Sequence, residues 1–211
     1  MKKILLSTIL FSVILCLVGC LTTLHPIFTS KDLVSDPRLI GSWEKAKDKT
    51  RVIYRQPNAN EINNLSSALQ NEAGKIYMLD EKDEQGNIKT TYYAFMVKLG
   101  KYYYIDYYPA SEKERQSADI FFAAHYTPMH SIYRIQFKNS SSFNVQQLDG
   151  GYLEKLIKNK QIRIKHEVME DGGIFITAPT EELQQYLIKY SGVPEAYNND
   201  HTMITVRSND L

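Results

Sequence analysis

The sequence predicts a mainly β fold, a strongly curved antiparallel sheet or barrel with two or three short helices. Apolar and polar residues alternate in most runs between residues 39 and 148, and turn residues separate the runs. The sequence contains fifteen tyrosines but one tryptophan. Tyrosine is favoured in strands that have one solvent-exposed and one packed side. The runs do not alternate regularly with helices, which argues against a doubly wound parallel sheet.

The first five predicted strands form a meander. Asp83-Glu84-Gln85-Gly86 separates two of them as a hairpin turn, and Gly100 turns the chain into the fifth. Ile62, Leu65 and Leu69 are spaced for one helical face, so a short helix over residues 61–71 is expected in the connection before the hairpin. The strands in order are residues 39–44, 50–56, 75–81, 87–99 and 101–108.

The second half of the chain adds strands and two clearer helices. Residues 109–118 are polar and predict an exposed loop, while residues 119–128 fit either a strand or a flap. Asp149 is placed to cap a helix over residues 151–158, and Thr180 to cap one that ends before Gly192. The later strands are residues 130–137, 142–148, 162–169, 173–177 and 202–207.

Length and charge limit the class of protein. The chain has 211 residues, which fits one globular domain with a full core. Residues 1–19 contain two lysines and no acidic residue, so without them the 25 basic side chains become 23, against 24 acidic ones. This balance, with no basic block longer than two residues, argues against a nucleic-acid binder.

The N-terminus has the layout of a secretory signal that ends at a cysteine. Lys2 and Lys3 precede an apolar run from Ile4 to Leu17. The sequence Leu17-Val18-Gly19-Cys20 closes the run and resembles the lipobox of bacterial prolipoproteins. The resemblance implies that the mature chain begins at Cys20, carries lipid including palmitate there, and is held to a membrane by that residue.

An uncleaved transmembrane helix is the alternative for the same stretch. Residues 4–19 supply about 16 positions, short of the roughly 20 that span a bilayer. Cleavage would remove Cys16, and lipid would occupy Cys20, so the exported domain would keep no thiol. Leu21 after the lipid site is not aspartate, which by resemblance to the sorting rule of two-membrane bacteria points to the outer membrane, facing the periplasm.

A second resemblance concerns the domain itself. Gly41-Ser42-Trp43 on the first strand resembles the Gly-x-Trp motif of calycin and lipocalin-like barrels, in which the tryptophan plugs one end. The longer run from His25 to Trp43, and the helix start at Ala178-Pro179-Thr180, resemble an uncharacterised group of bacterial lipoproteins associated with such barrels. We therefore expect a signal peptide over residues 1–19, a lipidated tether over 20–38 and one β domain over 39–211.

The sequence shows no motif for catalysis or for a cofactor. It has no Gly-x-Ser-x-Gly elbow, Gly-rich phosphate loop, His-Glu-x-x-His or EF-hand loop. His125 and His130 could contribute to a zinc site, but such a site needs three or four convergent ligands, and partly buried structural histidines explain them better. We expect no enzyme activity, no catalytic residue, no metal and no cofactor.

The strand over residues 101–108 carries the candidate ligand site. Alternation places Tyr102, Tyr104, Asp106 and Tyr108 on one face and Tyr103, Ile105 and Tyr107 on the other. The first face is polar enough to line a wet cavity inside the sheet, with Asp106 orienting a ligand, whereas the second suits packing against a helix. A purely structural aromatic ladder is the alternative.

These observations predict a membrane-anchored, exported lipoprotein that binds a small apolar or amphipathic ligand. The alternative is a structural or assembly lipoprotein that binds a protein partner in the cell envelope. An open cavity would favour the ligand binder, and a dry core filled by tyrosine and leucine would favour the partner binder.

Replacement of the proposed acylation site gives the first test. Cys20→Ser removes the thiol, so labelled palmitate should no longer be incorporated and processing should stop before residue 20. Metabolic labelling and the mass of the mature protein measure both effects. Label that persists in the Cys20→Ser protein contradicts the lipoprotein assignment.

Overall fold

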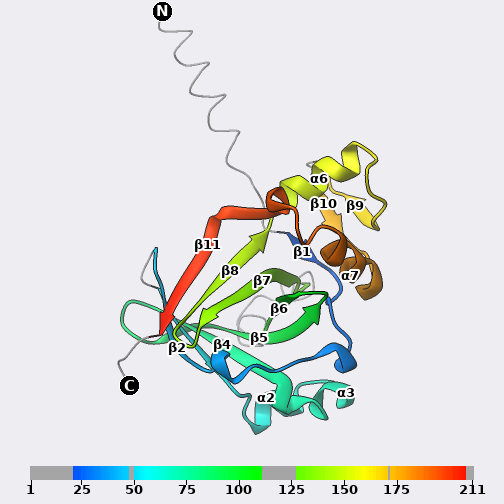
Figure 1. Ribbon diagram of the computed structural model, residues 1–211. Coiled ribbons are helices and arrows are strands. Elements are labelled where there is room, and N and C mark those ends of the chain that lie inside the picture. The colour runs from blue at the N-terminus through cyan, green and yellow to red at the C-terminus, as the bar shows by residue number, and fades with distance from the viewer. Residues whose placement is uncertain (1–20, 48–49, 111–126, 171, 208–211) are drawn as a thin grey trace, which may run out of the picture.

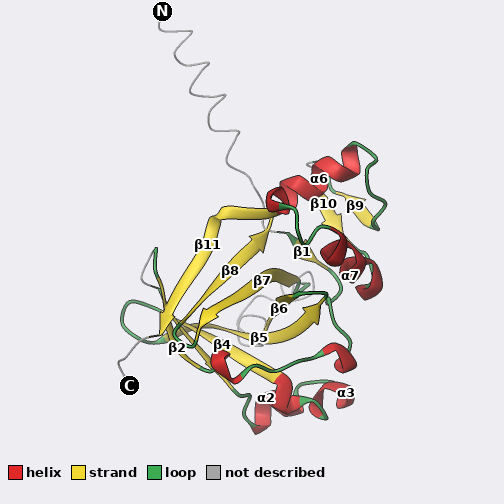
Figure 2. Cartoon of the chain, viewed as in Figure 1, coloured by secondary structure: helices red, strands yellow, loops and turns green. Residues whose placement is uncertain are grey.

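A computed structural model describes residues 21–47, 50–110, 127–170 and 172–207. It shows a mainly β protein, in which eleven strands form one mixed sheet accompanied by four short α-helices (Figures 1 and 2). The mainly β class is thus confirmed. The sheet is mixed rather than purely antiparallel, because β1 (Thr22–Thr23) pairs in parallel with β10 (Ile174–Ile176).

The remaining strands are β2 (Gly41–Lys45), β3 (Arg51–Arg55), β4 (Ile76–Lys82), β5 (Ile88–Leu99), β6 (Tyr102–Pro109), β7 (His130–Asn139), β8 (Ser142–Leu148), β9 (His166–Val168) and β11 (Tyr197–Arg207). Strands β2 to β8 and β10 lie close to the predicted ranges, whereas β9 is shorter than the predicted 162–169 and β11 begins before the predicted residue 202. The helices are α2 (Ala59–Asn63), α3 (Ser67–Gln70), α6 (Gly150–Lys158) and α7 (Thr180–Lys189), with 3-10 turns η2 (Ser30–Asp32), η3 (Pro37–Leu39), η4 (Ala73–Lys75) and η5 (Pro194–Ala196).

The meander pairs as its short turns require. Strands β2 to β6 pair consecutively and antiparallel, and β7 pairs with β8 in the same way. The terminal strand β11 lies between β2 and β8. Strand β6 also pairs with β7, from Tyr103 opposite Ile135 to Tyr107 opposite Ser131. The C-terminal strand β11 and the pairing of β6 with β7 therefore join the meander and the β7–β8 pair in one continuous sheet.

One face of the sheet encloses a core of large side chains. The hydroxyl groups of Tyr54 on β3 and Tyr107 on β6 lie 2.5 Å apart, although β4 and β5 separate their strands. Trp43 on β2 likewise packs edge to face on Phe143 of β8, with ring centroids 4.6 Å apart. Such contacts between non-adjacent strands require the sheet to curve around this face, which we call the inner face.

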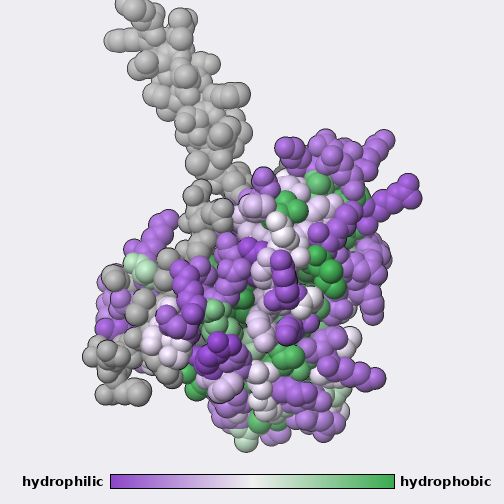
Figure 3. Space-filling view, in the orientation of Figure 1, coloured by the Kyte–Doolittle hydropathy of each residue, from purple (hydrophilic) through white to green (hydrophobic). Residues whose placement is uncertain are grey.

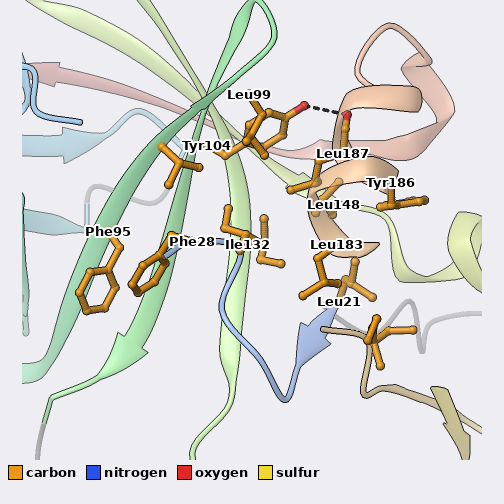
Figure 4. Close-up of a cluster of buried hydrophobic side chains, with 14 of the residues drawn as sticks. Leu21, Phe28, Phe95, Leu99, Tyr104, Ile132, Leu148, Leu183, Tyr186 and Leu187 are labelled. Atoms are coloured by element: carbon orange, nitrogen blue, oxygen red, sulfur yellow. Dashed lines mark hydrogen bonds between the residues drawn. The ribbon is translucent and has the colours of Figure 1, made fainter. Parts of the chain in front are cut away.

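The opposite, outer face is covered by the N-terminal segment and by helices α6 and α7. Figure 4 shows Leu183 and Leu187 of α7 beside Leu148 and Tyr104 of the sheet, and Phe28 beside Phe95. In Figure 1 the N-terminal segment, drawn in blue, runs from β1 along the outside of the sheet to β2. The face drawn in Figure 3 is mostly hydrophilic with scattered apolar residues, as expected for a covered core.

Residues 21–38 pack more closely than a tether would. Thr22–Thr23 form β1, which pairs with β7 and β10, and the side chains of Ile27 and Leu33 are buried in the outer core. Pro26 and Pro37 prevent a long regular strand here but not this packing. The described part of the expected tether is therefore continuous with the domain.

Two local predictions about helices were wrong. The helix expected over residues 61–71 is two short helices, α2 and α3, because Asn64 ends the first and Ser66 begins the second. Thr180 does not cap α7, since Pro179 occupies the cap position and the Thr180 hydroxyl donates to the carbonyl of Pro26 at 2.8 Å. The cap at α6 was predicted correctly, because Asp149 accepts from the N–H of Tyr152 at 2.8 Å.

The position of Trp43 gives a stability prediction. Its side chain is 1% exposed and its indole N–H donates to the carbonyl of Leu39 at 2.9 Å. Trp43→Ala should therefore lower the free energy of unfolding by about 3–5 kcal/mol. Thermal unfolding of a soluble form that begins at residue 21 measures the change, with Trp43→Phe as a milder control. An unchanged midpoint in Trp43→Ala would show that the buried indole does not stabilise the core.

Candidate functional site

The structure reverses the two faces that we assigned to β6. Tyr102, Tyr104, Asp106 and Tyr108 belong to the outer face, and Tyr103, Ile105 and Tyr107 to the inner one. The Tyr104 hydroxyl donates to the carbonyl of Leu187 at 3.2 Å, so this residue packs under α7 instead of lining a cavity. Alternation separates two faces but does not say which one a helix covers.

Only part of the expected site comes together. Tyr102 lies at the edge of the outer core, where the guanidinium of Arg134 is 4.9 Å from its ring centroid. That guanidinium also donates to the carbonyl of Ser191 just beyond α7, so Tyr102 and Tyr104 both belong to the docking of this helix. Asp106 and Tyr108, in contrast, contact His130.

Asp106 is a fully buried carboxyl group that joins three segments. One oxygen accepts from the N–H of Ile27 at 3.0 Å, and the other lies 2.8 Å from Nδ1 of His130. Burial raises the pKa of Asp106, while the interactions with His130 and Ile27 act in the opposite direction. The carboxyl group thereby fixes the N-terminal segment on β6 and sets the orientation of the imidazole.

A groove of about 410 Å³ lies beside this pair. Its aromatic side chains come from four segments of the chain. Phe28 and Phe95 stack with ring centroids 4.3 Å apart, and Tyr108 lies against the imidazole of His130 at 4.7 Å. Tyr93 completes the aromatic wall. The volume falls in the range of small-molecule sites.

The polar groups of the groove are few. Thr29, Ser30, Asn64 and Ser66 line it together with the imidazole of His130. His130 is 8% exposed, and its Nε2 makes no hydrogen bond within the described residues. When Asp106 is ionised, Nδ1–H of a neutral imidazole donates to it and Nε2 is left as an acceptor. The groove can thus hold an apolar body and bind one polar group.

The connection through α2 and α3 forms the opposite wall, with Leu65 and Leu69 packed toward the groove. The guanidinium of Arg55 on β3 holds this wall in place. It donates to both carboxylate oxygens of Glu61 at 2.7 and 2.8 Å and also to Asp80 at 2.6 Å. Tyr93 donates to the carbonyl of Glu61 at 2.8 Å. Side-chain contacts therefore anchor a short helix that would be marginal alone.

A smaller cavity of about 160 Å³ lies on the inner face. It is lined by the tyrosine pair Tyr54 and Tyr107 and by apolar residues that include Val52 and Leu79. Burial raises the pKa of both hydroxyl groups, which keeps this pair neutral at physiological pH. The cavity could hold only a molecule of about the size of benzene.

Some predicted features lie outside the described residues. These are Cys20, the signal sequence, His125 and most of the segment over residues 109–128. In the ranges that are described, no group of three or more His, Cys, Asp or Glu side chains could hold a metal ion. No helix of those ranges is both long and apolar enough to cross a bilayer.

Sequence reasoning missed the groove residues outside β6. Phe28, Phe95 and Tyr93 lie on segments that the fold brings together from distant positions. The spacing of Leu65 and Leu69 did indicate an apolar helical face, but not what it covers. Comparisons with protein-family models, curated proteins and solved structures find no significant match to this chain.

The Arg55 contacts predict an effect of pH on stability. Hydrogen bonds from Arg55 lower the pKa of Glu61, and partial burial opposes them. The ionised carboxylate therefore stabilises the fold above its unfolded pKa of about 4.3, and this stabilisation is lost as the pH falls through the lower folded pKa. Glu61→Gln should cost about 1 kcal/mol at pH 7 and less at pH 3.

Denaturant unfolding at both pH values measures the difference. Glu84→Gln is the control, because it removes an exposed carboxylate that makes no hydrogen bond or ion pair in the described structure. The control should change stability little at either pH. An equal loss at pH 3 and pH 7 in Glu61→Gln would show that ionisation of Glu61 does not hold the wall.

Proposed function

We propose that this chain is an exported lipoprotein whose single β domain binds a small amphipathic molecule in the aromatic groove. The observation that carries the proposal is the groove itself: a hollow of about 410 Å³ in which stacked Phe28 and Phe95 lie beside a buried, oriented histidine. Apolar pockets with a few placed polar groups are typical of small-molecule sites.

The anchor rests on the sequence alone. Leu17-Val18-Gly19-Cys20 supports lipidation at Cys20 and attachment to a bacterial membrane, and Leu21 favours the outer membrane, facing the periplasm, if the source has two membranes. One acyl chain holds a protein only marginally, whereas two or more anchor it stably. The membrane is thus the first partner that we propose.

We also infer that the ladder closes into a lipocalin-like barrel of eight strands. Support comes from β6, which pairs with β5 and with β7, so that the order β6-β5-β4-β3-β2-β11-β8-β7 returns to its start. An eight-stranded barrel has an interior that side chains nearly fill. The inner cavity of about 160 Å³ agrees with this, and the larger groove outside is the better ligand site.

The lining of the groove favours a neutral ligand. Its described lining residues include no lysine, arginine, aspartate or glutamate. A charged group would lose hydration there without a fixed countercharge, which is costly. A hydroxyl group could instead donate to Nε2 of His130 while an alkyl or aromatic body contacts Phe28, Phe95 and Leu69. Catalysis is not part of the proposal, because Nε2 of His130 has no nucleophile hydrogen-bonded to it in the described residues.

One observation favours the alternative function in envelope assembly. Tyr104 and Asp106 are fully buried and have no contact with solvent. A dry core of this kind is what we expected of a partner-binding protein. A protein partner could then place an apolar side chain in the same groove. The tests below separate this case from binding of a small molecule.

Two size-increasing substitutions locate the ligand. Leu69→Trp adds a large ring in the groove, and Leu79→Trp adds one in the inner cavity as the matched control. An aliphatic alcohol or apolar dye should bind the unmodified domain with one-to-one stoichiometry. Leu69→Trp should weaken binding at least about tenfold, a change of about 1.4 kcal/mol, while Leu79→Trp should not change it. Fluorescence titration and calorimetry measure both.

Each other outcome has a distinct meaning. Weakening by Leu79→Trp alone would place the ligand inside the curved sheet. If folded protein shows no saturable binding across a panel of alcohols, fatty acids and apolar dyes, the small-molecule function is wrong and the partner-binding function becomes the better account.

A further inference from the structure

We propose that the end of the domain formed by the β9–β10 hairpin rests on the lipid bilayer, with Val168 and Met169 in contact with the membrane interface. The inference depends on the lipid anchor proposed above. It adds the orientation of the domain and identifies the surface that contacts the membrane.

The direction of β1 points to this end. Thr23 pairs in parallel with Ile176, and the N–H of Leu24 donates to the carbonyl of Ile176 at 3.0 Å. Because the two strands run in the same direction, residues before Thr23 lie beside residues before Ile176. Ile174 in turn pairs with Val168, next to the turn of the hairpin. The chain therefore enters the domain on the side of that turn.

No flexible linker separates the proposed lipid site from the first described residue, Leu21. Leu21 is buried in the outer core, and Thr22 pairs with Ser131 of β7. Residue 20 is joined to Leu21 by one peptide bond, so their Cα atoms lie about 3.8 Å apart. A lipid on Cys20 would consequently hold this end of the folded domain at the membrane surface, without a linker between them.

The hairpin carries two apolar side chains that are largely exposed among the described residues. Val168 is 68% exposed and the adjacent Met169 is 53% exposed. Hydrogen bonds from the N–H of Met169 to Gly173 and from the N–H of Gly172 to Met169 fix the turn. Neighbouring exposed apolar residues on a well-formed turn are expected where a protein meets a lipid interface or another apolar surface.

The charges nearby indicate an apolar contact. Arg163 and Lys165 precede β9, while Glu167 and Glu170 lie in the hairpin. Since both signs are present, attraction to anionic lipid does not explain the contact. Binding through Val168 and Met169 should thus occur on zwitterionic membranes as well.

A single introduced thiol tests the orientation. The only cysteines of the chain are Cys16, which processing would remove, and Cys20, which lipid would occupy, so Val168→Cys supplies the one free thiol of the lipidated protein. Ile88→Cys is the matched control. It also lies on a hairpin and is 59% exposed, but the β4–β5 hairpin lies at the opposite end of the molecule (Figure 1). Both proteins receive the same environment-sensitive dye and are reconstituted in phosphatidylcholine vesicles.

Vesicles with brominated acyl chains should quench the dye at position 168 several-fold more strongly than at position 88. Equal or weaker quenching at position 168, in protein that floats with the vesicles, overturns the orientation and leaves the anchor intact. Adding Met169→Asp to Val168→Cys should reduce the quenching while flotation persists. Protein that does not float with the vesicles overturns the anchor, and the inference with it.

Discussion

The buried carboxyl group of Asp106 is the contact on which the arrangement of the outer face depends. It binds the backbone of Ile27 and the ring of His130, which are 79 and 24 residues away in the sequence. Loss of either partner would leave a polar group unsatisfied in an apolar core, which is strongly destabilising. The N-terminal segment therefore lies in one place across the sheet, and this position creates one wall of the groove.

The two faces of the sheet differ in what fills them. Aromatic rings, from Trp43 and Phe143 to the pair of Tyr54 and Tyr107, pack with aliphatic side chains to fill the inner face. The outer face is closed by segments that arrive from elsewhere in the sequence, namely the N-terminal segment, α6 and α7. Between the N-terminal segment and the connection through α2 and α3 a hollow remains, and the buried side chains of Phe95 and His130 line it.

Local signals predicted strands β2 to β8 well, and distant contacts explain much of what they did not predict. Alternation located β6 and separated Tyr104 from Tyr107, but the inner and outer faces are decided by partners such as Leu187 and Tyr54. Likewise, Pro26 and Pro37 correctly indicated irregular structure, whereas the burial of Ile27 depends on Asp106. Of the expected ligand residues, Tyr108 alone lines the groove and Asp106 acts through His130.

The N-terminal segment would connect the proposed anchor to the candidate site. Leu21 to Thr23 fix the point at which a lipid on Cys20 would meet the domain, and Phe28 to Ser30, a few residues later, line the groove. The segment is held on both sides, by Asp106 at Ile27 and by the Thr180 hydroxyl at Pro26. A groove wall pinned at two adjacent residues is preorganised, so a ligand would not have to order it on binding.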